Sequence, residues 1–274
     1  MSGEGTITSL QAPKRILVAN RGEIAIRIMH AAAELGISSV AIYSEDDASA
    51  LHVRKADMAV SLGASGARAY LDGAKIVEIA RDTGCDAIHP GYGFLSENAK
   101  FAQSCIDAGI IFIGPEPVTL ELFGDKVAAR RLAEKVGVPL LDGTAGPTSL
   151  EEVQTYFDSL GPGGAVMIKA VAGGGGRGMR KVEKITDLES AYKLCSSEAE
   201  ASFGNGDVYV ERLVRHARHI EVQIIGDGSD IAHLWERECT IQRRHLKVVD
   251  IAPAPELSAI LRVHLLKAAV TLAE

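Results

Sequence analysis

The segment Lys169-Ala170-Val171-Ala172-Gly173-Gly174-Gly175-Gly176-Arg177-Gly178-Met179 decides how the second half of this chain is interpreted. It follows a short apolar run, 165–168, that is typical of a buried strand, and Met179 begins a second apolar run that predicts a return strand. Four consecutive glycines reach positive φ freely and leave their N–H groups open to an anion, with Lys169 and Arg177 adding positive charge on either side. The pattern predicts a hairpin that covers phosphate, although a bare glycine run is also typical of a flexible surface loop.

A second dense cluster of charge lies between Glu236 and Lys247 and reads ERECTIQRRHLK. If residues 241–249 form one half-buried strand, its alternation directs Arg243, His245 and Lys247 to one side. A row of cations held partly away from solvent suits a small anion, because charges interact more strongly there than in water. The alternative is a solvated face, which most charge runs are.

Residues 15 to about 115 alternate between strand and helix patterns. Short apolar runs at 16–19, 40–43, 86–88 and 110–113 are separated by helical spacing, as in the stripe Ile24, Ile28, Ala31 and Leu35. The alternation predicts an α/β fold with a parallel sheet, in which ligands gather beyond the carboxyl ends of the strands. Two polar loops, 20–23 and 89–94, follow strands at such ends.

The sequence pattern changes beyond about residue 140, where the regular alternation of strand and helix ends. Ser149 to Glu152 and Thr186 to Glu189 both have capping-box spacing, which predicts that a helix begins at each. From Val208 the pattern becomes antiparallel β, with runs at 208–211, 219–225 and 231–238. In the second run, alternation places His219, Glu221 and Gln223 on the polar or ligand-facing side.

Composition limits the classes of partner. The net charge of −7 argues against nucleic acid or an anionic membrane surface as the main partner, and no apolar run approaches the roughly 20 residues that span a bilayer. The first 13 residues are polar and predict a disordered lead-in without a signal or transit peptide. The four cysteines show no Cys-x-x-Cys spacing, so we expect reduced thiols and a cytoplasmic protein, with a mitochondrial or plastid location left open.

Five motifs together resemble biotin carboxylase, the ATP-grasp component of the biotin-dependent carboxylases. In chain order they are 16–26 with the core Ala-Asn-Arg-Gly-Glu-Ile-Ala, 89–98 (HPGYGFLSEN), 124–126, 169–179 and 236–253. The resemblance implies a lead-in at 1–13, a Rossmann-like pre-ATP-grasp domain at 14–125 and an ATP-grasp domain at 126–274. The latter is expected to hold a lid at about 140–210 and only the start of the catalytic half.

The family resemblance also implies a reaction. ATP activates bicarbonate to carboxyphosphate with Mg²⁺ or Mn²⁺, and biotin on a carrier domain is then carboxylated. The implied partners are a biotin carboxyl carrier domain and a carboxyltransferase domain or subunit, and the family tends to dimerise. An acyl-CoA carboxylase of fatty acid metabolism is one expectation, but acetyl-CoA, propionyl-CoA, pyruvate and urea all stay open as the final acceptor.

The resemblance assigns roles to individual residues. Lys247 is expected to hold bicarbonate and to act in catalysis with Arg244 and His245, whereas Tyr92, Gly93 and Glu97 are expected on the biotin side. The family's metal-binding glutamates, general base and biotin-contacting arginine fall beyond Glu274, so we expect no metal ligands in this chain and no carboxylation by it alone. The implied ATP-binding residues are Lys126, Lys169, Gly174, Gly175, Gly176, Met179, Glu211, Arg212, Val214, His219, Gln242 and His245.

Two other classes of function stay open at this point. One is another bicarbonate-using ATP-grasp ligase, such as a carbamoyl-phosphate synthetase, against which the QRRH segment at 242–245 and the HPGYGF loop argue. The other is a non-catalytic nucleotide-binding module, which an intact chain without catalytic glutamates would favour.

Overall fold

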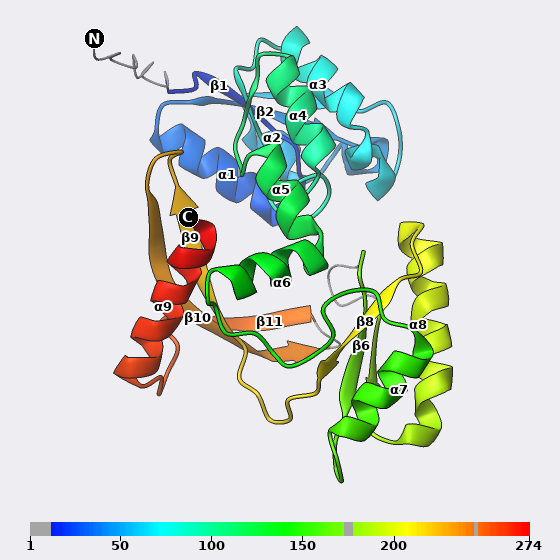
Figure 1. Cartoon of the computed structure of the whole chain (residues 1–274). Helices are drawn as coiled ribbons and strands as arrows, with labels where there is room; N and C mark the ends of the chain where they lie inside the picture. Colours follow the sequence, from blue (N-terminus) through cyan, green and yellow to red (C-terminus); the bar gives the residue numbers. More distant parts are fainter. Residues whose placement is uncertain (1–11, 173–177, 244–245) are drawn as a thin grey trace, which may run out of the picture. The chain divides into compact units, whose positions relative to one another are not determined.

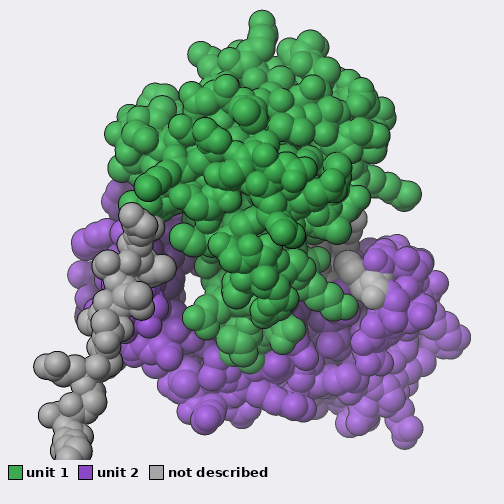
Figure 2. Space-filling model, turned by 90° about the horizontal axis from the view of Figure 1, so that it is seen from above, with its two compact units in different colours: residues 1–122 green, residues 123–274 purple. Residues whose placement is uncertain are grey.

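The computed structural model describes residues 12–172, 178–243 and 246–274. Its elements are labelled in Figure 1. The chain divides into two compact units, Met1–Leu122 and Phe123–Glu274, which are coloured separately in Figure 2. No helix among the described residues is long and apolar enough to cross a membrane.

Unit 1 is built on a five-stranded sheet whose paired strands are all parallel, which confirms the predicted parallel sheet. Its strands follow the order β3-β2-β1-β4-β5. Chain connections therefore leave β1 and β4 toward opposite edges of the sheet, so the carboxyl ends of these two neighbours form a topological switch point. The strand bounds are β1 Arg15–Val18, β2 Ser38–Tyr43, β3 Met58–Ser61, β4 Ala87–His89 and β5 Ile111–Phe112.

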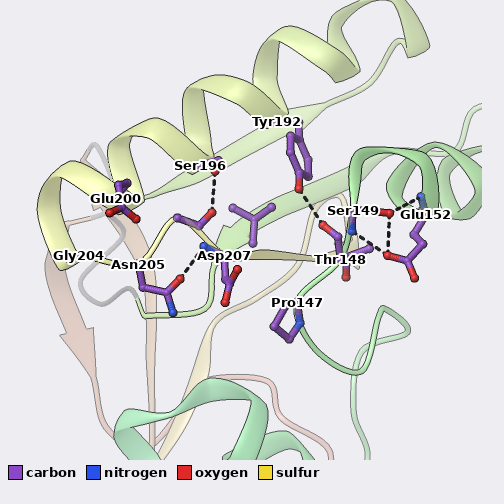
Figure 3. A pocket seen from close by; sticks show the side chains of 12 residues that line it. Pro147, Thr148, Ser149, Glu152, Tyr192, Ser196, Glu200, Gly204, Asn205 and Asp207 are labelled. Carbon is purple, nitrogen blue, oxygen red and sulfur yellow. Dashed lines mark hydrogen bonds between the residues drawn. The ribbon is translucent and has the colours of Figure 1, made fainter.

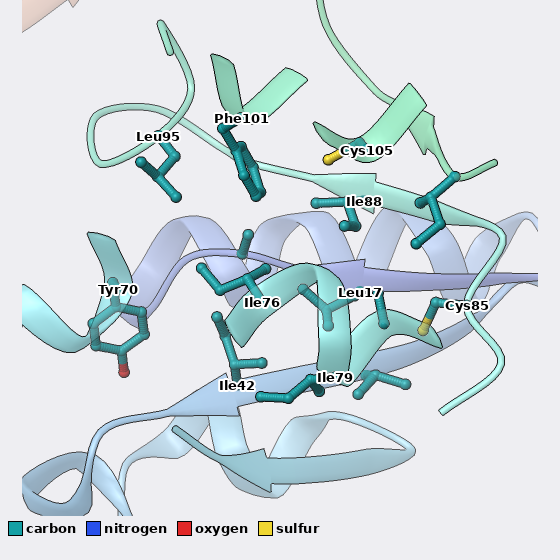
Figure 4. Packing of buried hydrophobic residues seen from close by; sticks show 14 of the residues in the cluster. Leu17, Ile42, Tyr70, Ile76, Ile79, Cys85, Ile88, Leu95, Phe101 and Cys105 are labelled. Atoms are coloured by element: carbon teal, nitrogen blue, oxygen red, sulfur yellow. The ribbon is translucent and has the colours of Figure 1, made fainter. Parts of the chain in front are cut away.

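Helices cover both faces of this sheet. On one face, α1 packs Ile28 and Met29 against Ile16 and Val18. On the other face, α3 and α4 cover a cluster that contains Leu17, Ile42 and Ile88, with their side chains seen in Figure 4. The helices that begin in this part of the chain are α1 Gly22–Glu34, α2 Leu51–Lys55, α3 Gly73–Asp82, α4 Ala99–Asp107 and α5 Pro117–Gly124.

The predicted apolar stripe of α1 is partly wrong. Ile28 is buried as expected, but the other fully buried positions are Ala25, Met29 and Ala32. Leu35 is 75% exposed because the helix has already ended at Glu34.

Unit 2 begins with helix α6 (Lys126–Lys135) and contains a three-stranded antiparallel sheet in the order β7-β6-β8. The strands are β6 Val166–Ala170, β7 Met179–Val182 and β8 Val208–Arg212. The β6–β7 pairing confirms the strands predicted on both sides of the glycine run, with Lys169 inside β6. Helices α7 (Leu150–Ser159) and α8 (Leu188–Phe203) pack on one face through a shared apolar cluster, which leaves the other face of the sheet to carry polar groups.

Only one of the two predicted capping boxes forms. The Ser149 hydroxyl accepts from the Glu152 N–H and the Glu152 carboxylate accepts from the Ser149 N–H, so α7 begins as predicted. The second helix, α8, begins at Leu188 within the predicted segment but without the box, because a short 3₁₀ turn, Ile185–Asp187, precedes it and makes Asp187 its N-cap. Thr186 donates to the Asp187 carboxylate instead of capping the helix.

The remainder of unit 2 is a second antiparallel sheet in the order β11-β10-β9, followed by helix α9 (Ala259–Ala273). Its strands, β9 Ile220–Gly226, β10 Ile231–Arg243 and β11 Leu246–Ile251, confirm the predicted antiparallel runs. The charge run does not form one strand, because β10 ends at Arg243 and pairs antiparallel with β11, which begins at Leu246.

This antiparallel pairing changes which side chains share a face. Gln242 lies directly opposite Lys247, and Arg243 lies opposite Leu246. Opposed residues in an antiparallel pair project to the same side, so Arg243 and Lys247 project to opposite sides rather than to one. His245, the third member of the predicted row, lies outside the described residues.

Candidate active site

A cluster of charged side chains lies on the sheet face of unit 2 that α7 and α8 leave uncovered. Lys169 on β6 and Glu211 on β8 form an ion pair. Arg130 of α6 donates to the same carboxylate at 2.6 Å from Nη1 to Oε1. Lys126, the first residue of α6, directs its Nζ to the Ala170 carbonyl oxygen at 3.4 Å. Lys126 and Lys169, both predicted to contact phosphate, therefore lie close together at the end of β6, and Lys169 alone of the two pairs with Glu211.

The electrostatics of this cluster favour an anionic ligand. Glu211 is only 6% exposed, and two cations offset the cost of burying its charge. Burial lowers the pKa of Lys126, and the nearby charge of Lys169 lowers it further. A bound phosphate would relieve that repulsion, so the cluster is prepared for a negative ligand beside Lys126.

The local sequence explains how α6 and β8 meet. The Asp125 carboxylate accepts from the N–H groups of Val127 and Ala128, which fixes the start of the helix at Lys126. Gly143 pairs with Glu211, and a Cβ on Gly143 would lie 2.4 Å from the Val210 carbonyl oxygen. This close approach requires glycine. Arg130 closes the junction by donating through Nη2 to the Leu141 carbonyl at 2.9 Å.

The other residues predicted to bind the nucleotide make no side-chain hydrogen bond or ion pair with this cluster or lie outside the described residues. Met179 is half-buried and pairs with Lys169 at the start of β7. Arg212 and Val214 are exposed at and just beyond the end of β8. Gly174, Gly175 and Gly176, together with Arg244 and His245, lie outside the described residues.

A second polar cluster lies on the β9–β11 sheet. The Glu221 carboxylate receives both Lys247 and Arg237, and Arg237 is its direct partner in the register. Burial alone would raise the pKa of Glu221, but hydrogen bonds from Lys247 and Arg237 outweigh it and hold the pKa below its ordinary value. Glu221 therefore stays ionised at neutral pH, and it orients the lysine predicted to hold bicarbonate.

His219 and Gln242 adjoin this second cluster. The Gln242 side-chain nitrogen lies 2.9 Å from His219 Nδ1, and it also lies 2.9 Å from the Cys239 carbonyl oxygen. Because Gln242 is directly opposite Lys247, three predicted site residues are gathered at this end of the sheet. The exposed His219 and Gln223 confirm the polar face predicted from the alternation of β9.

The sequence did not identify Arg130 and Arg237, the two arginines that bind the same carboxylates as Lys169 and Lys247. Arg130 stands four residues after Lys126 on α6, a spacing that places both on one helix face and was available as a signal. Its pairing with Glu211, 81 residues away, had no local signal. Arg237 joins Glu221 only through the β9–β10 register, which the composition of the charge run did not define.

The residues predicted on the biotin side belong to unit 1. Tyr92 and Gly93 follow β4 at the switch point of the parallel sheet. Tyr92 is 62% exposed and its hydroxyl donates to the Glu23 carboxylate. Gly93 adopts a φ of +64°, and Glu97 is exposed further along the same loop.

A surface pocket of about 800 Å³ opens in unit 2 beside the start of α7 and the end of α8. Polar groups dominate its lining, including Thr148, Ser149, Ser196 and Asp207, as Figure 3 shows. None of the predicted site residues lines it, so the two lysine clusters define the candidate site. Among the described residues, no group of three His, Cys, Asp or Glu side chains is arranged to hold a metal ion.

The fold and these clusters define an α/β protein with an ATP-grasp-type domain. Residues 12–120 match the family model of the biotin carboxylase N-terminal domain, and residues 125–274 match that of the carbamoyl-phosphate synthase L chain ATP-binding domain. The first match, together with pyruvate carboxylase and 2-oxoglutarate carboxylase relatives, favours biotin carboxylase over a carbamoyl-phosphate synthetase. The chain belongs to the biotin carboxylase family.

Named relatives support this placement. The chain is 50% identical to pyruvate carboxylase of Bacillus subtilis over 97% of its length, and 51% identical to mitochondrial pyruvate carboxylase of Homo sapiens over 95%. It spans 23% and 22% of those two proteins, less than a quarter of each.

Solved structures agree. The biotin carboxylase domain of Hydrogenobacter thermophilus 2-oxoglutarate carboxylase, in complex with MgADP, ADP and bicarbonate, superposes with a TM-score of 0.91 at 42% identity, covering 96% of this chain and 58% of that one. A biotin carboxylase–β,γ-ATP complex from Campylobacter jejuni also gives 0.91, at 41% identity, covering 95% and 59%.

Proposed function

We propose that this chain provides the ATP- and bicarbonate-binding part of a biotin carboxylase, which carboxylates biotin through carboxyphosphate. The observation that carries the proposal is the convergence of Lys126 and Lys169 at the end of β6, where Lys126 contacts the Ala170 carbonyl oxygen and Lys169 pairs with Glu211. The relatives solved with MgADP and bicarbonate, and with an ATP-type ligand, support the same ligands here.

In this proposal the two clusters divide the work. Lys126 and Lys169 neutralise the nucleotide phosphates while a bicarbonate oxygen attacks the γ-phosphorus and ADP leaves. Glu211 and Arg130 hold Lys169 in place for that role. Lys247 binds bicarbonate, oriented by Glu221. Carboxyphosphate then yields CO₂ and phosphate, and N1′ of biotin is carboxylated on the side of Tyr92 and Gly93.

Magnesium, when bound, would supply positive charge that offsets the charge of the nucleotide phosphates. The described residues of this chain offer no cluster of carboxylates that fits such an ion, so no step is assigned to it on these residues. The proposed partners are a biotin carboxyl carrier domain, a carboxyltransferase and a second copy of the chain. A dimer of the Hydrogenobacter thermophilus domain supports the last of these.

The final acceptor is proposed to be set outside this chain. Pyruvate carboxylases, a 2-oxoglutarate carboxylase and a long-chain acyl-CoA carboxylase match it at 42–51% identity. The expected place in fatty acid metabolism is thus one option beside the carboxylation of keto acids. The relatives include both bacterial and mitochondrial proteins. We propose that the protein is cytoplasmic if it comes from a bacterium.

The proposal is tested by omitting single substrates from a reaction of the full-length enzyme. We expect ¹⁴C-carboxybiotin to form only when ATP, magnesium, bicarbonate and biotin are all present, and ADP release to require ATP, magnesium and bicarbonate. Carboxybiotin formed without ATP, or ADP release indifferent to bicarbonate, would contradict it. That the 274-residue chain cannot carboxylate biotin by itself stays a prediction.

A further inference from the structure

The loop that carries Tyr92 and Gly93 is held by a buried side chain from another strand. Asn20 stands just beyond the end of β1 and is 3% exposed. Its amide nitrogen donates to the Pro90 carbonyl at 2.7 Å and to the Tyr92 carbonyl at 2.8 Å. Its Oδ1 accepts from the Arg21 N–H at 2.9 Å, so every strong donor and acceptor of the amide is used.

The loop is shaped to receive this amide. Gly91, between the two carbonyls, adopts a φ of +67°, and a Cβ there would lie 2.7 Å from Asn20 Nδ2. The Gly91 N–H donates to His89 Nδ1 at 3.1 Å. Burial lowers the pKa of His89, which keeps its ring neutral and able to accept this bond.

The residues after Tyr92 are restrained by the neighbour of Asn20. Arg21 places its guanidinium 5.6 Å from the ring centre of Tyr70 and 6.0 Å from that of Phe94. The same guanidinium donates to the Asp47 carboxylate at 2.9 Å. The loop is therefore fixed at Pro90, Tyr92 and Phe94, while the Tyr92 ring stays exposed at the switch point.

We infer that Asn20 is a positioning residue for biotin: by binding the Pro90 and Tyr92 carbonyls it sets the backbone that presents Tyr92 and Gly93. This inference rests on the proposed function. Asn20 itself touches no reacting atom, so its loss should weaken the use of biotin and leave the lysine clusters of unit 2 unaffected. An asparagine is required because an aspartate of the same size would set a carboxylate against two carbonyl oxygens.

The test compares Asn20→Asp and Asn20→Ala in the full-length enzyme, with free biotin as the varied substrate. Asn205→Asp is the matched control, because the Asn205 side chain accepts a hydrogen bond from the Asp207 N–H, makes no other hydrogen bond with a described residue, and can be replaced by a carboxylate. We expect the KM for biotin to rise about tenfold in both Asn20 variants, with the KM for ATP within about twofold of wild type. Hydrogen–deuterium exchange of the 89–98 peptide should become faster in both, and neither change should occur in the control.

The outcomes distinguish a failure of the positioning role of Asn20 from a failure of the proposed function. An unchanged biotin KM with a loosened loop would overturn the positioning role, and so would an equal rise in the KM values for biotin and ATP. Unchanged exchange in the 89–98 peptide would show that Asn20 does not hold the loop. A wild-type enzyme that carboxylates no biotin would overturn the proposed function, whereas the exchange measurement would still report on Asn20. If Asn20→Asp fails to fold, the uncharged Asn20→Ala variant decides the result.

Discussion

Arg130 and Glu211 form an ion pair of 2.6 Å although 81 residues separate them in sequence. The pair joins helix α6 to strand β8, and the second oxygen of the carboxylate receives Lys169. A residue outside the predicted site therefore determines how the carboxylate meets the lysine predicted to bind phosphate. The pair connects the stability of unit 2 to the geometry of its proposed nucleotide site.

Removing Arg130 is expected to destabilise unit 2. Arg130→Gln leaves the buried Glu211 with one cation fewer and the Leu141 carbonyl without its donor. We expect the free energy of unfolding to fall by about 2–3 kcal/mol in urea denaturation. The control is Arg131→Gln, because Arg131 is exposed and its side chain makes no hydrogen bond or ion pair with any described residue. Equal losses in both variants would contradict the role given to Arg130.

Gly143 is expected to tolerate no side chain. In Gly143→Ala the new Cβ would press on the Val210 carbonyl oxygen and on the Glu211 backbone, so β8 or the 141–143 segment must shift. We expect a loss of about 1–3 kcal/mol in stability, measured by thermal or urea unfolding. Gly146→Ala is the matched control, since its Cβ would meet only Val127 at 3.7 Å. A neutral Gly143→Ala would show that the close approach is not required.

Nucleotide binding is expected to draw a proton onto Lys126 in alkaline solution. Burial and the charge of Lys169 lower the pKa of Lys126 below its ordinary value of 10.5, and nearby phosphates raise it again. Between the lowered pKa and 10.5, ADP binding should therefore take up protons. Calorimetry in two buffers with different ionisation enthalpies measures this uptake. Lys126→Arg should abolish it because arginine stays charged, and the same uptake in that variant would assign the proton elsewhere.

Asp47 is expected to contribute a pH-dependent part of the stability of unit 1. Burial would raise the pKa of Asp47, but hydrogen bonds from Arg21 and Tyr70 lower it below the ordinary value of 3.8. The resulting stability is present above that value and is lost as the pH falls through the lowered pKa. Asp47→Asn should destabilise the chain at neutral pH by about 1–3 kcal/mol and weaken the loss of stability below pH ~4.

The control for this pH dependence is Asp82→Asn at an exposed position of α3. It should leave the acid slope of the unfolding free energy as in wild type. If the acid slope of the unfolding free energy in Asp47→Asn equals the slopes of wild type and Asp82→Asn, Asp47 does not contribute to the pH dependence of stability.

Regular patterns in the sequence predicted much of the fold. The alternation over 15–115 predicted the parallel sheet, and the apolar runs around the glycines predicted β6 and β7. Those signals are local, because burial of one face follows directly from residue periodicity. The buried face predicted for α1 was partly wrong, because Leu35 continues the helical spacing although the helix has already ended at Glu34.

Features that depend on tertiary contacts were missed. The antiparallel pairing of β10 with β11 was missed because the run of cations that the two strands share has no glycine, proline or asparagine to divide it. The pairing of Arg130 with Glu211 and of Glu221 with Lys247 depends on how strands and helices meet, which no spacing encodes. The resemblance to biotin carboxylase supplied the lysines and Glu211, and the structure supplied the pairing of Lys169 with Glu211 and of Lys247 with Glu221.

The central claim is that Lys169 binds the nucleotide phosphates and Lys247 binds bicarbonate. Steady-state kinetics of Lys169→Gln and Lys247→Gln in the full-length enzyme test this claim most directly. The assay measures ADP release while ATP and bicarbonate are varied separately. Each substitution removes a charge-assisted hydrogen bond of about 1.5–3 kcal/mol. We predict that Lys169→Gln raises the KM for ATP by at least about tenfold, whereas Lys247→Gln depresses bicarbonate-dependent turnover and keeps the KM for ATP. Equal effects of both substitutions on both substrates would contradict the account.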